Sequence, residues 1–419
     1  MLNQAKQIIP HIIDQHAEEA AFLWLLRNNA VDAPHYNLND LAKLDDRVDA
    51  HLDGLRIAGD YGWQACCENL QVKESGEVFA ATILALEGQA LDRINLVYGI
   101  VEDAPETING LISAFGWVEA DHLQGKVNGL LVSENPLWRQ VGLSACVIHR
   151  VDPGKFLEQA IWDGDIQLRA RALKAVGELG RVDLKAALLK QLDNDDCNSR
   201  FWAAWSAVLI GDRGPALNLL NAEIEENSEF CIEAMQLVLR VVDVQVVKQT
   251  LKVLADNPDS VRQAIIGGSY SGDSTYIPWL IRQMNTPKLA KIAGEAFSTL
   301  SGVDLAYQDM ESELPNGEAD GPNDNPDDDD VAMDVDEDLA CPDSLLVQQW
   351  WQDNKQNFKP DVRYLYGKPC NATQCEWILR NSTQRLRYAA ALALALMKPS
   401  QALFEVRAIG KRQQKALIL

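Results

Sequence analysis

Apolar residues along the chain recur with the spacing of one helical face, and this pattern repeats about every thirty residues. We mark the same position in each unit by one residue, called the register point. The side chains three, four, six and seven residues after each register point are small or apolar in every unit, as in Ala172, Leu173, Ala175 and Val176 after Arg169. Those offsets share one face of an α-helix. The pattern therefore predicts one buried helix in each unit. The register points, 28 to 32 residues apart, are Glu77, Thr107, Arg139, Arg169, Arg200, Cys231, Arg262 and Ala290.

A second apolar helix follows each register helix after a polar turn, as in the stretch from Leu184 to Leu192. Unit boundaries carry helix-start residues, for example Asn135-Pro136 and Asp163-Gly164-Asp165. Asn and Asp accept hydrogen bonds from the free N–H groups of a first turn, and Pro fits that turn. Hairpins that cover one another's apolar faces stack into a solenoid, and small residues let their helices approach closely. We predict an all-α fold, an α-solenoid of helical hairpins.

Four segments follow from this pattern. Residues 1–70 form a helical N-terminal cap, in which Leu41, Leu44, Val48, Leu52 and Leu55 share a helix that begins at Asn39 or Asp40. Residues 71–310 form the repeat array. Residues 311–339 form an acidic disordered linker, and residues 340–419 form a small helical C-terminal module with one more repeat-like helix after Arg385.

The net charge of −23 is distributed unevenly. Residues 311–339 hold thirteen acids and no Lys or Arg, whereas residues 340–419 carry twelve basic and five acidic side chains. A run of like charges with Pro and Gly has little to bury, so we expect this linker to be disordered. An acidic array repels phosphate, so we expect no nucleic-acid partner.

Cysteine and histidine usage predicts a protein of the cytoplasm without a metal or cofactor. The eight cysteines form no CxxC pair and several lie in apolar helical patterns, which favours buried free thiols over disulfides. Cys370 and Cys375 are near metal-ligand spacing, but no second pair or nearby histidine completes a site. Neither the mixed residues from Met1 to Trp24 nor the short apolar run from Tyr388 to Met397 predicts a signal peptide or a membrane span.

No catalytic motif occurs with supporting context, so we predict no catalytic residue, and the candidate functional residues are those suited to protein binding. Tryptophan rings and arginines are common interface anchors, although the tryptophans also fit the core and the arginines also fit bonds to adjacent turns, such as Asp165 or Asp196 four residues upstream. The candidates are Trp138, Trp162, Trp202, Trp205, Trp279, Arg139, Arg169 and Arg200.

The segment Arg-x-x-Ala-Leu-x-Ala-Val-Gly-x-Leu-Gly from Arg169 to Gly180 resembles the HEAT-like repeats of bacterial α-solenoids. Segments near both ends of the chain resemble a bacterial HEAT-like repeat family associated with type VI secretion gene clusters. Those near the start are Leu52-Asp53-Gly54-Leu55-Arg56, Gly62-Trp63 and Gly76-Glu77-Val78-Phe79-Ala80. Those near the end are Arg363-Tyr364-Leu365-Tyr366-Gly367-Lys368-Pro369 and Gln384 to Ala391. The resemblance implies that the gene lies beside genes for spike, PAAR-like and adaptor proteins. The acidic linker is an insertion relative to the pattern of that family.

Three classes of function are consistent with these features. One of them, a self-assembling structural or immunity-type protein, has no specific sequence feature in its favour. Of the other two, the first is a non-enzymatic protein-binding scaffold or adaptor, which handles effector cargo or spike components of a type VI secretion system as the resemblance implies. The alternative is an enzyme on a HEAT-like scaffold, similar to a bilin lyase or a DNA glycosylase. A glycosylase needs a cationic groove for duplex DNA, and the acidic array argues against one.

Overall fold

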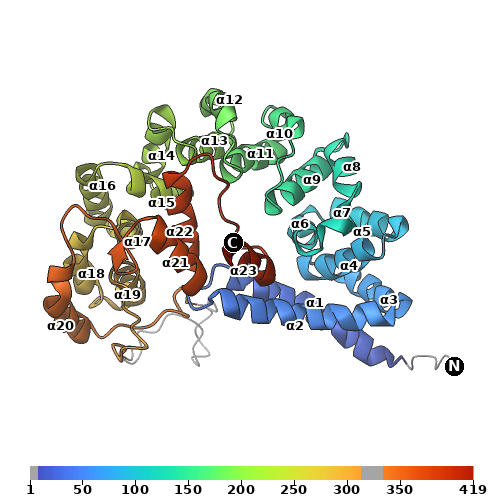
Figure 1. The fold of residues 1–419 in the computed structure, drawn as a ribbon, viewed down its shortest axis with the longest axis horizontal. Coiled ribbons are helices and arrows are strands. Elements are labelled where there is room, and N and C mark those ends of the chain that lie inside the picture. The colour runs from blue at the N-terminus through green and yellow to red at the C-terminus, as the bar shows by residue number, and fades with distance from the viewer. Residues whose placement is uncertain (1–7, 313–333, 419) are drawn as a thin grey trace, which may run out of the picture. The chain divides into compact units, whose positions relative to one another are not determined.

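The computed structural model describes residues 8–312 and 334–418, and over these residues the protein is built almost entirely of α-helices (Figure 1). The predicted all-α class is confirmed. The chain divides into two compact units. Unit 1 comprises residues 1–32, 36–179 and 405–419, and unit 2 comprises residues 33–35 and 180–404.

Unit 1 begins with two long antiparallel helices, α1 and α2, that pack along each other. Its helices are α1 (Pro10–Ala30), α2 (Leu38–Ala58), α3 (Asp60–Asn69), α4 (Ser75–Glu87), α5 (Leu91–Asp103), α6 (Ile108–Trp117), α7 (Ala120–Leu123), α8 (Lys126–Leu131), α9 (Pro136–Ile148), α10 (Lys155–Ala160), α11 (Ile166–Glu178) and α23 (Gly410–Ile418), with 3₁₀ turns at Leu70–Val72 and Pro105–Thr107.

The register helices of unit 1 pack on one another in sequence order, α4 on α6, α6 on α9 and α9 on α11. Three of them also contact a neighbouring helix: α4 contacts α5, which follows it, whereas α9 and α11 contact α8 and α10, which precede them. The predicted face is buried in each of them, for example at Leu173 and Val176 of α11. The local pattern thus predicted the packing face correctly, while the solenoid as a whole stays a prediction.

The predicted N-terminal helix is α2, and its five periodic apolar residues are all buried. It begins slightly earlier than we predicted. The side chain of Asn37, rather than Asn39 or Asp40, caps it by accepting hydrogen bonds from the backbone N–H groups of those two residues, at 2.8 and 3.1 Å. An aromatic cluster of Trp24, Phe79 and Trp117 fills the core beside α4.

Unit 2 continues the same alternation of helices. Its elements are η3 (Val182–Leu184), α12 (Lys185–Lys190), η4 (Gln191–Asp193), α13 (Cys197–Leu209), α14 (Pro215–Glu225), α15 (Cys231–Val241), α16 (Val244–Asp256), η5 (Pro258–Ser260), α17 (Val261–Ser271), η6 (Ser274–Tyr276), α18 (Ile277–Gln283), α19 (Pro287–Ser301), α20 (Ser344–Asn354), η7 (Lys355–Asn357), β1 (Tyr364–Leu365), β2 (Lys368–Pro369), α21 (Ala372–Asn381) and α22 (Gln384–Met397). The helices α13, α15, α17 and α19 pack in sequence order, and α22 contacts α13, α15 and α21.

A short antiparallel hairpin of β1 and β2 is a feature that the sequence pattern did not predict. Arg363, just before β1, donates hydrogen bonds to the carbonyl oxygens of Leu239, Ser271 and Val242 at the ends of α15 and α17. These carbonyls lie at helix ends, where they have no partner within the helix. One guanidinium group therefore holds the hairpin against two register helices.

The predicted disordered linker lies mostly outside the described residues, because residues 313–333 are not described. Its last part makes specific contacts within unit 2. Asp334 pairs with Lys291 at 2.6 Å, and Asp336 pairs with both terminal nitrogens of Arg262 at 2.6 and 2.7 Å. Residues 334–336 are thus held against α17 and α19.

The final residues of the chain, 405–418, belong to unit 1, so the predicted module 340–419 is divided between the two units. We call residues 405–418 the C-terminal strap. The side chain of Asp45 on α2 accepts hydrogen bonds from Arg27 Nε at 2.8 Å and from the backbone N–H of Gly410 at 2.5 Å. Arg27 also donates to the carbonyl of Ala408 at 2.9 Å, and Arg412 donates to the carbonyl of Gly116 at 2.9 Å.

Candidate functional site

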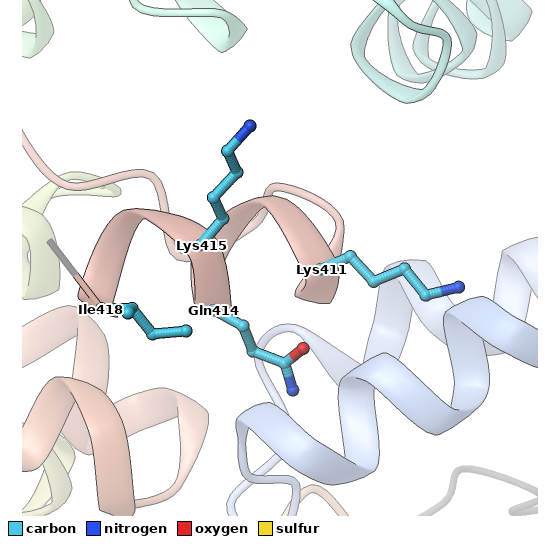
Figure 2. A pocket seen from close by; sticks show the side chains of 4 residues that line it. All are labelled: Lys411, Gln414, Lys415 and Ile418. Carbon is cyan, nitrogen blue, oxygen red and sulfur yellow. The ribbon is translucent and has the colours of Figure 1, made fainter.

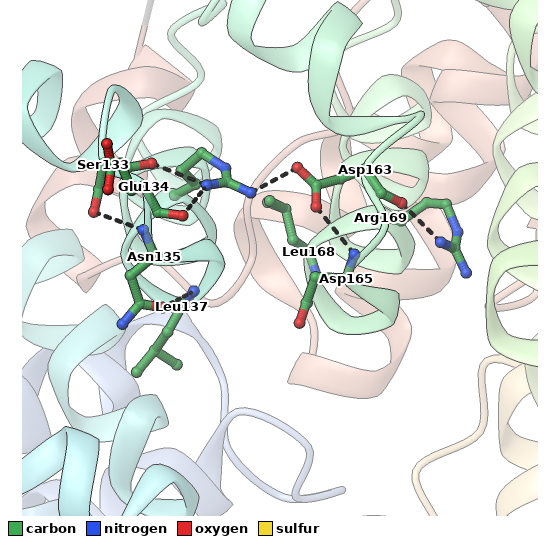
Figure 3. A network of polar contacts seen from close by, with 9 residues as sticks. Ser133, Glu134, Asn135, Leu137, Asp163, Asp165, Leu168 and Arg169 are labelled. Carbon is green, nitrogen blue, oxygen red and sulfur yellow. Dashed lines mark hydrogen bonds and ion pairs between the residues drawn. The ribbon is translucent and has the colours of Figure 1, made fainter.

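The register arginines bind the turns between units, and this supports their structural interpretation (Figure 3). Arg139 Nη1 donates to the carbonyls of Ser133 and Glu134 at 2.9 and 2.7 Å, and its Nη2 pairs with the Asp163 carboxylate at 2.7 Å. Arg169 Nη1 donates to the carbonyl of Asp163 at 2.7 Å. Asp163 therefore receives one arginine from the preceding unit and one from its own.

The partners of these arginines differ from those suggested by spacing. Asp165 and Asp196, four residues upstream, instead cap α11 and α13 by accepting the N–H groups of Leu168 and Ser199 at 2.9 and 2.7 Å. The arginine reaches carbonyls five and six residues upstream, as Arg200 does at Asp195 and Asn194. The capping carboxylate is held by the first turn of its helix, so the arginine bonds the preceding turn.

The environment of Asp163 favours its charged form. Partial burial raises the pKa of Asp163, but the N–H of Asp165 and the guanidinium groups of Arg139 and Arg169 outweigh burial and lower it. The carboxylate is thus ionised throughout the neutral range and keeps its pairing with Arg139.

Replacing Arg139 with alanine should lower the free energy of unfolding by about 1–2 kcal/mol, because it removes three hydrogen bonds from a half-buried guanidinium. Arg139→Lys is the matched control, since it keeps the charge but cannot span two carbonyls and a carboxylate at once. Urea unfolding followed by circular dichroism measures both. If lysine restored the full stability, charge alone and not the three-way bridge would stabilise the turn.

The five candidate tryptophans lie in different environments. Trp138 is buried, stacks on Tyr98 and donates its Nε1–H to Glu102 at 3.0 Å. Trp205 is buried and packs edge-on against half-buried Trp202. Trp138 and Trp205 are part of the core, whereas Trp202 is half-buried beside Trp205. Trp162 is 53% exposed, and Trp279 is half-buried and packs against the core of unit 2, so these two rings also keep some accessible surface.

Trp279 lines a groove of about 430 Å³ between α16 and the η6–α18 segment in unit 2. The apolar floor is formed by Leu251, and Tyr276 lies beside it. Lys248 and Lys252 come from successive turns of α16 and form no ion pair with any residue that the structure describes. We call this the Trp279 groove. Its eight lining residues are Lys248, Leu251, Lys252, Ala255, Asp256, Thr275, Tyr276 and Trp279.

The Tyr276 hydroxyl is a further feature of this groove. Its oxygen is buried and has no hydrogen-bond partner within residues 8–312 and 334–418. Burial raises the pKa of Tyr276, so the hydroxyl stays protonated at neutral pH. A buried hydroxyl without a partner costs free energy.

A second hollow, of about 370 Å³, is lined by Lys411, Gln414, Lys415 and Ile418 of the C-terminal strap (Figure 2). Figure 2 shows Lys411 and Lys415 leaving the helix in different directions. Lys411 pairs with Asp46 of α2 at 2.5 Å. A hollow lined by a single helix does not enclose a ligand, so it is a weaker candidate than the Trp279 groove.

Some residues are brought together that the sequence did not pair. The Nδ1 atoms of His16 and His51 lie 3.2 Å apart. Burial lowers the pKa of His51, and the neighbouring His16 lowers it further. Across the described ranges no three His, Cys, Asp or Glu side chains are grouped so that they could hold a metal ion.

No family model, no curated protein and no solved structure matches this chain. Among the described helices, none has both the length and the apolar character that a membrane crossing requires.

Proposed function

We propose that the protein is a non-enzymatic scaffold that binds another protein through a surface that includes the Trp279 groove. The observation that supports this most is the position of Trp279, a half-buried ring above an apolar floor with two lysines on the opposite helix. Tryptophan in such an environment is typical of binding hot spots, because the ring buries a large apolar area on binding and loses little side-chain conformational entropy.

The groove favours a polypeptide segment that carries an apolar side chain flanked by carboxylates. A hollow of about 430 Å³ accommodates a few side chains. Lys248 and Lys252 supply positive charge without a described carboxylate partner. The acidic array as a whole favours a basic or polar partner surface. The local charge at the groove favours acidic groups instead.

We further propose that the partner is one of the proteins implied by the resemblance to the type VI secretion family, an effector, a PAAR-like protein or an adaptor. The resemblance supports this choice because members of that family are encoded beside genes for such proteins. The groove chemistry narrows it to a partner with an acidic, apolar-anchored segment.

The test measures binding of each such partner to the full chain and to variants by calorimetry. Trp279→Ala should weaken the complex about tenfold to thirtyfold, which corresponds to about 1.4–2 kcal/mol. The double change Lys248→Glu and Lys252→Glu should weaken it most at low salt, because screening reduces exposed charge attraction.

Trp162→Ala is the matched control, because this ring is 53% exposed and lies outside the groove. Trp162→Ala should change the dissociation constant of the complex by less than about threefold. A complex that depends on Trp162 and not on Trp279 would place the binding surface on unit 1 and contradict the proposal.

A further inference from the structure

Two cysteines of the C-terminal region, Cys370 and Cys375, lie in contact in the structure. Cys370 follows β2, and Cys375 lies in α21. Asn371, the N-cap residue of α21, separates Cys370 from the helix. Their sulfur atoms are 3.8 Å apart. A disulfide needs a sulfur separation near 2.05 Å, so the two sulfur atoms must move closer to form one.

The surroundings of Cys370 favour the thiolate. Arg240 of α15 and Arg363 before β1 bring positive charge from two separate elements, and the backbone N–H of Cys370 bonds the carbonyl of Arg363 at 2.8 Å. Arg240 itself is fixed over the ring of Tyr270, 5.3 Å from the centroid, and by a bond to the carbonyl of Gln236. Cationic neighbours and a helix start are the settings in which thiols become reactive.

The pKa values of the two thiols are shifted in opposite directions. The hydrogen bond from Cys375 lowers the pKa of Cys370 to about 7 against the effect of burial, and Arg240 and Arg363 assist. The same hydrogen bond and burial raise the pKa of Cys375. Cys370 is half-buried, so a small oxidant reaches it, while Cys375 is buried and protonated.

We propose that Cys370 and Cys375 form a peroxide-reactive dithiol, in which Cys370 is the nucleophile and Cys375 the resolving thiol. The Cys370 thiolate attacks one oxygen of a hydroperoxide, the O–O bond breaks, the sulfur becomes a sulfenic acid, and hydroxide or an alkoxide leaves. The Cys375 thiol then attacks that sulfur, the S–O bond breaks, and its proton leaves with the hydroxyl as water. Each cycle oxidises two thiols by two electrons and reduces one hydroperoxide.

The test treats the reduced full chain with one equivalent of hydrogen peroxide and maps its cysteines by mass spectrometry. The disulfide between Cys370 and Cys375 should form while Cys197 remains a thiol. Cys197 is the matched control because it is exposed and therefore more accessible than Cys370. Oxidation of Cys197 at the same rate, or oxidation of Cys370 without a bond to Cys375, would refute the proposal.

Two variants separate the roles of the thiols. In Cys375→Ser, Cys370 should accumulate as a sulfenic acid that dimedone traps, and in Cys370→Ser, Cys375 should not react. Iodoacetamide should alkylate Cys370 faster than Cys197 at pH 7, and Arg240→Gln should slow this several-fold. Circular dichroism checks that each variant is folded. Equal alkylation rates in wild type and Arg240→Gln would show that the arginine does not activate the thiol.

Discussion

Replacing Asp45 with alanine should lower the free energy of unfolding by about 3–5 kcal/mol. The side chains of Asp45 and Arg27 are only 5% and 10% exposed, and they pair at 2.8 Å. Without the carboxylate, the Arg27 guanidinium stays buried with the carbonyl of Ala408 in place of its charged partner. The N–H of Gly410 also loses its acceptor at the start of α23. The change therefore destabilises α1, α2 and the C-terminal strap together.

Asp46→Ala provides the matched control on the next residue. Asp46 pairs with Lys411 of the same strap, but both side chains are more than half exposed. Exposed pairs contribute about 0–1 kcal/mol, so this variant should unfold almost like the wild type. Urea titration followed by circular dichroism compares the two. Equal losses for the two variants would show that burial does not govern the contribution of this pair.

The sequence predicted the register helices well because their signal is local. An apolar face recurs within each helix, and the caps Asn135, Asp165 and Asp196 lie next to the turns they satisfy. Such features depend on neighbours a few residues away. They therefore appear in the sequence without knowledge of the packing.

The C-terminal strap could not be predicted in the same way. Arg27 and Ala408 are 381 residues apart, and Asp45 and Gly410 are 365 apart. One arginine or one aspartate on an amphipathic helix carries no sign of such a partner. The hairpin of β1 and β2 was missed for a related reason, because its strands have only two residues each and show no alternation.

The candidate site was predicted only in part. All five tryptophans were visible as possible anchors, but the register helices are covered by neighbours on more than one side. Trp205 is therefore buried although it lies outside the four periodic offsets. Trp279 differs because α16 leaves a groove beside it. The close spacing of Cys370 and Cys375 was also visible, whereas the proximity of Arg240 depends on the packing of unit 2.

Gly110→Ala should also destabilise the protein strongly, because Gly110 lies where two register helices approach closely. It occupies one of the small positions on the repeated face of α6, which packs on α4. A Cβ atom there would lie 1.9 Å from the carbonyl oxygen of Ser75, the first residue of α4. A backbone oxygen cannot rotate away as a side chain can, so the two helices must separate.

Overpacking of this kind costs about 1–3 kcal/mol, and here we expect the upper part of that range in the free energy of unfolding. Gly99→Ala in the exposed middle of α5 is the matched control, because nothing lies within 4 Å of its added Cβ. That variant should gain about 0.5–1 kcal/mol, since alanine is the better helix former. Thermal and urea unfolding of both variants would therefore shift in opposite directions. If both variants gained stability, α4 and α6 would not be in close contact at Gly110, and the small residues of the repeated face would have a different cause.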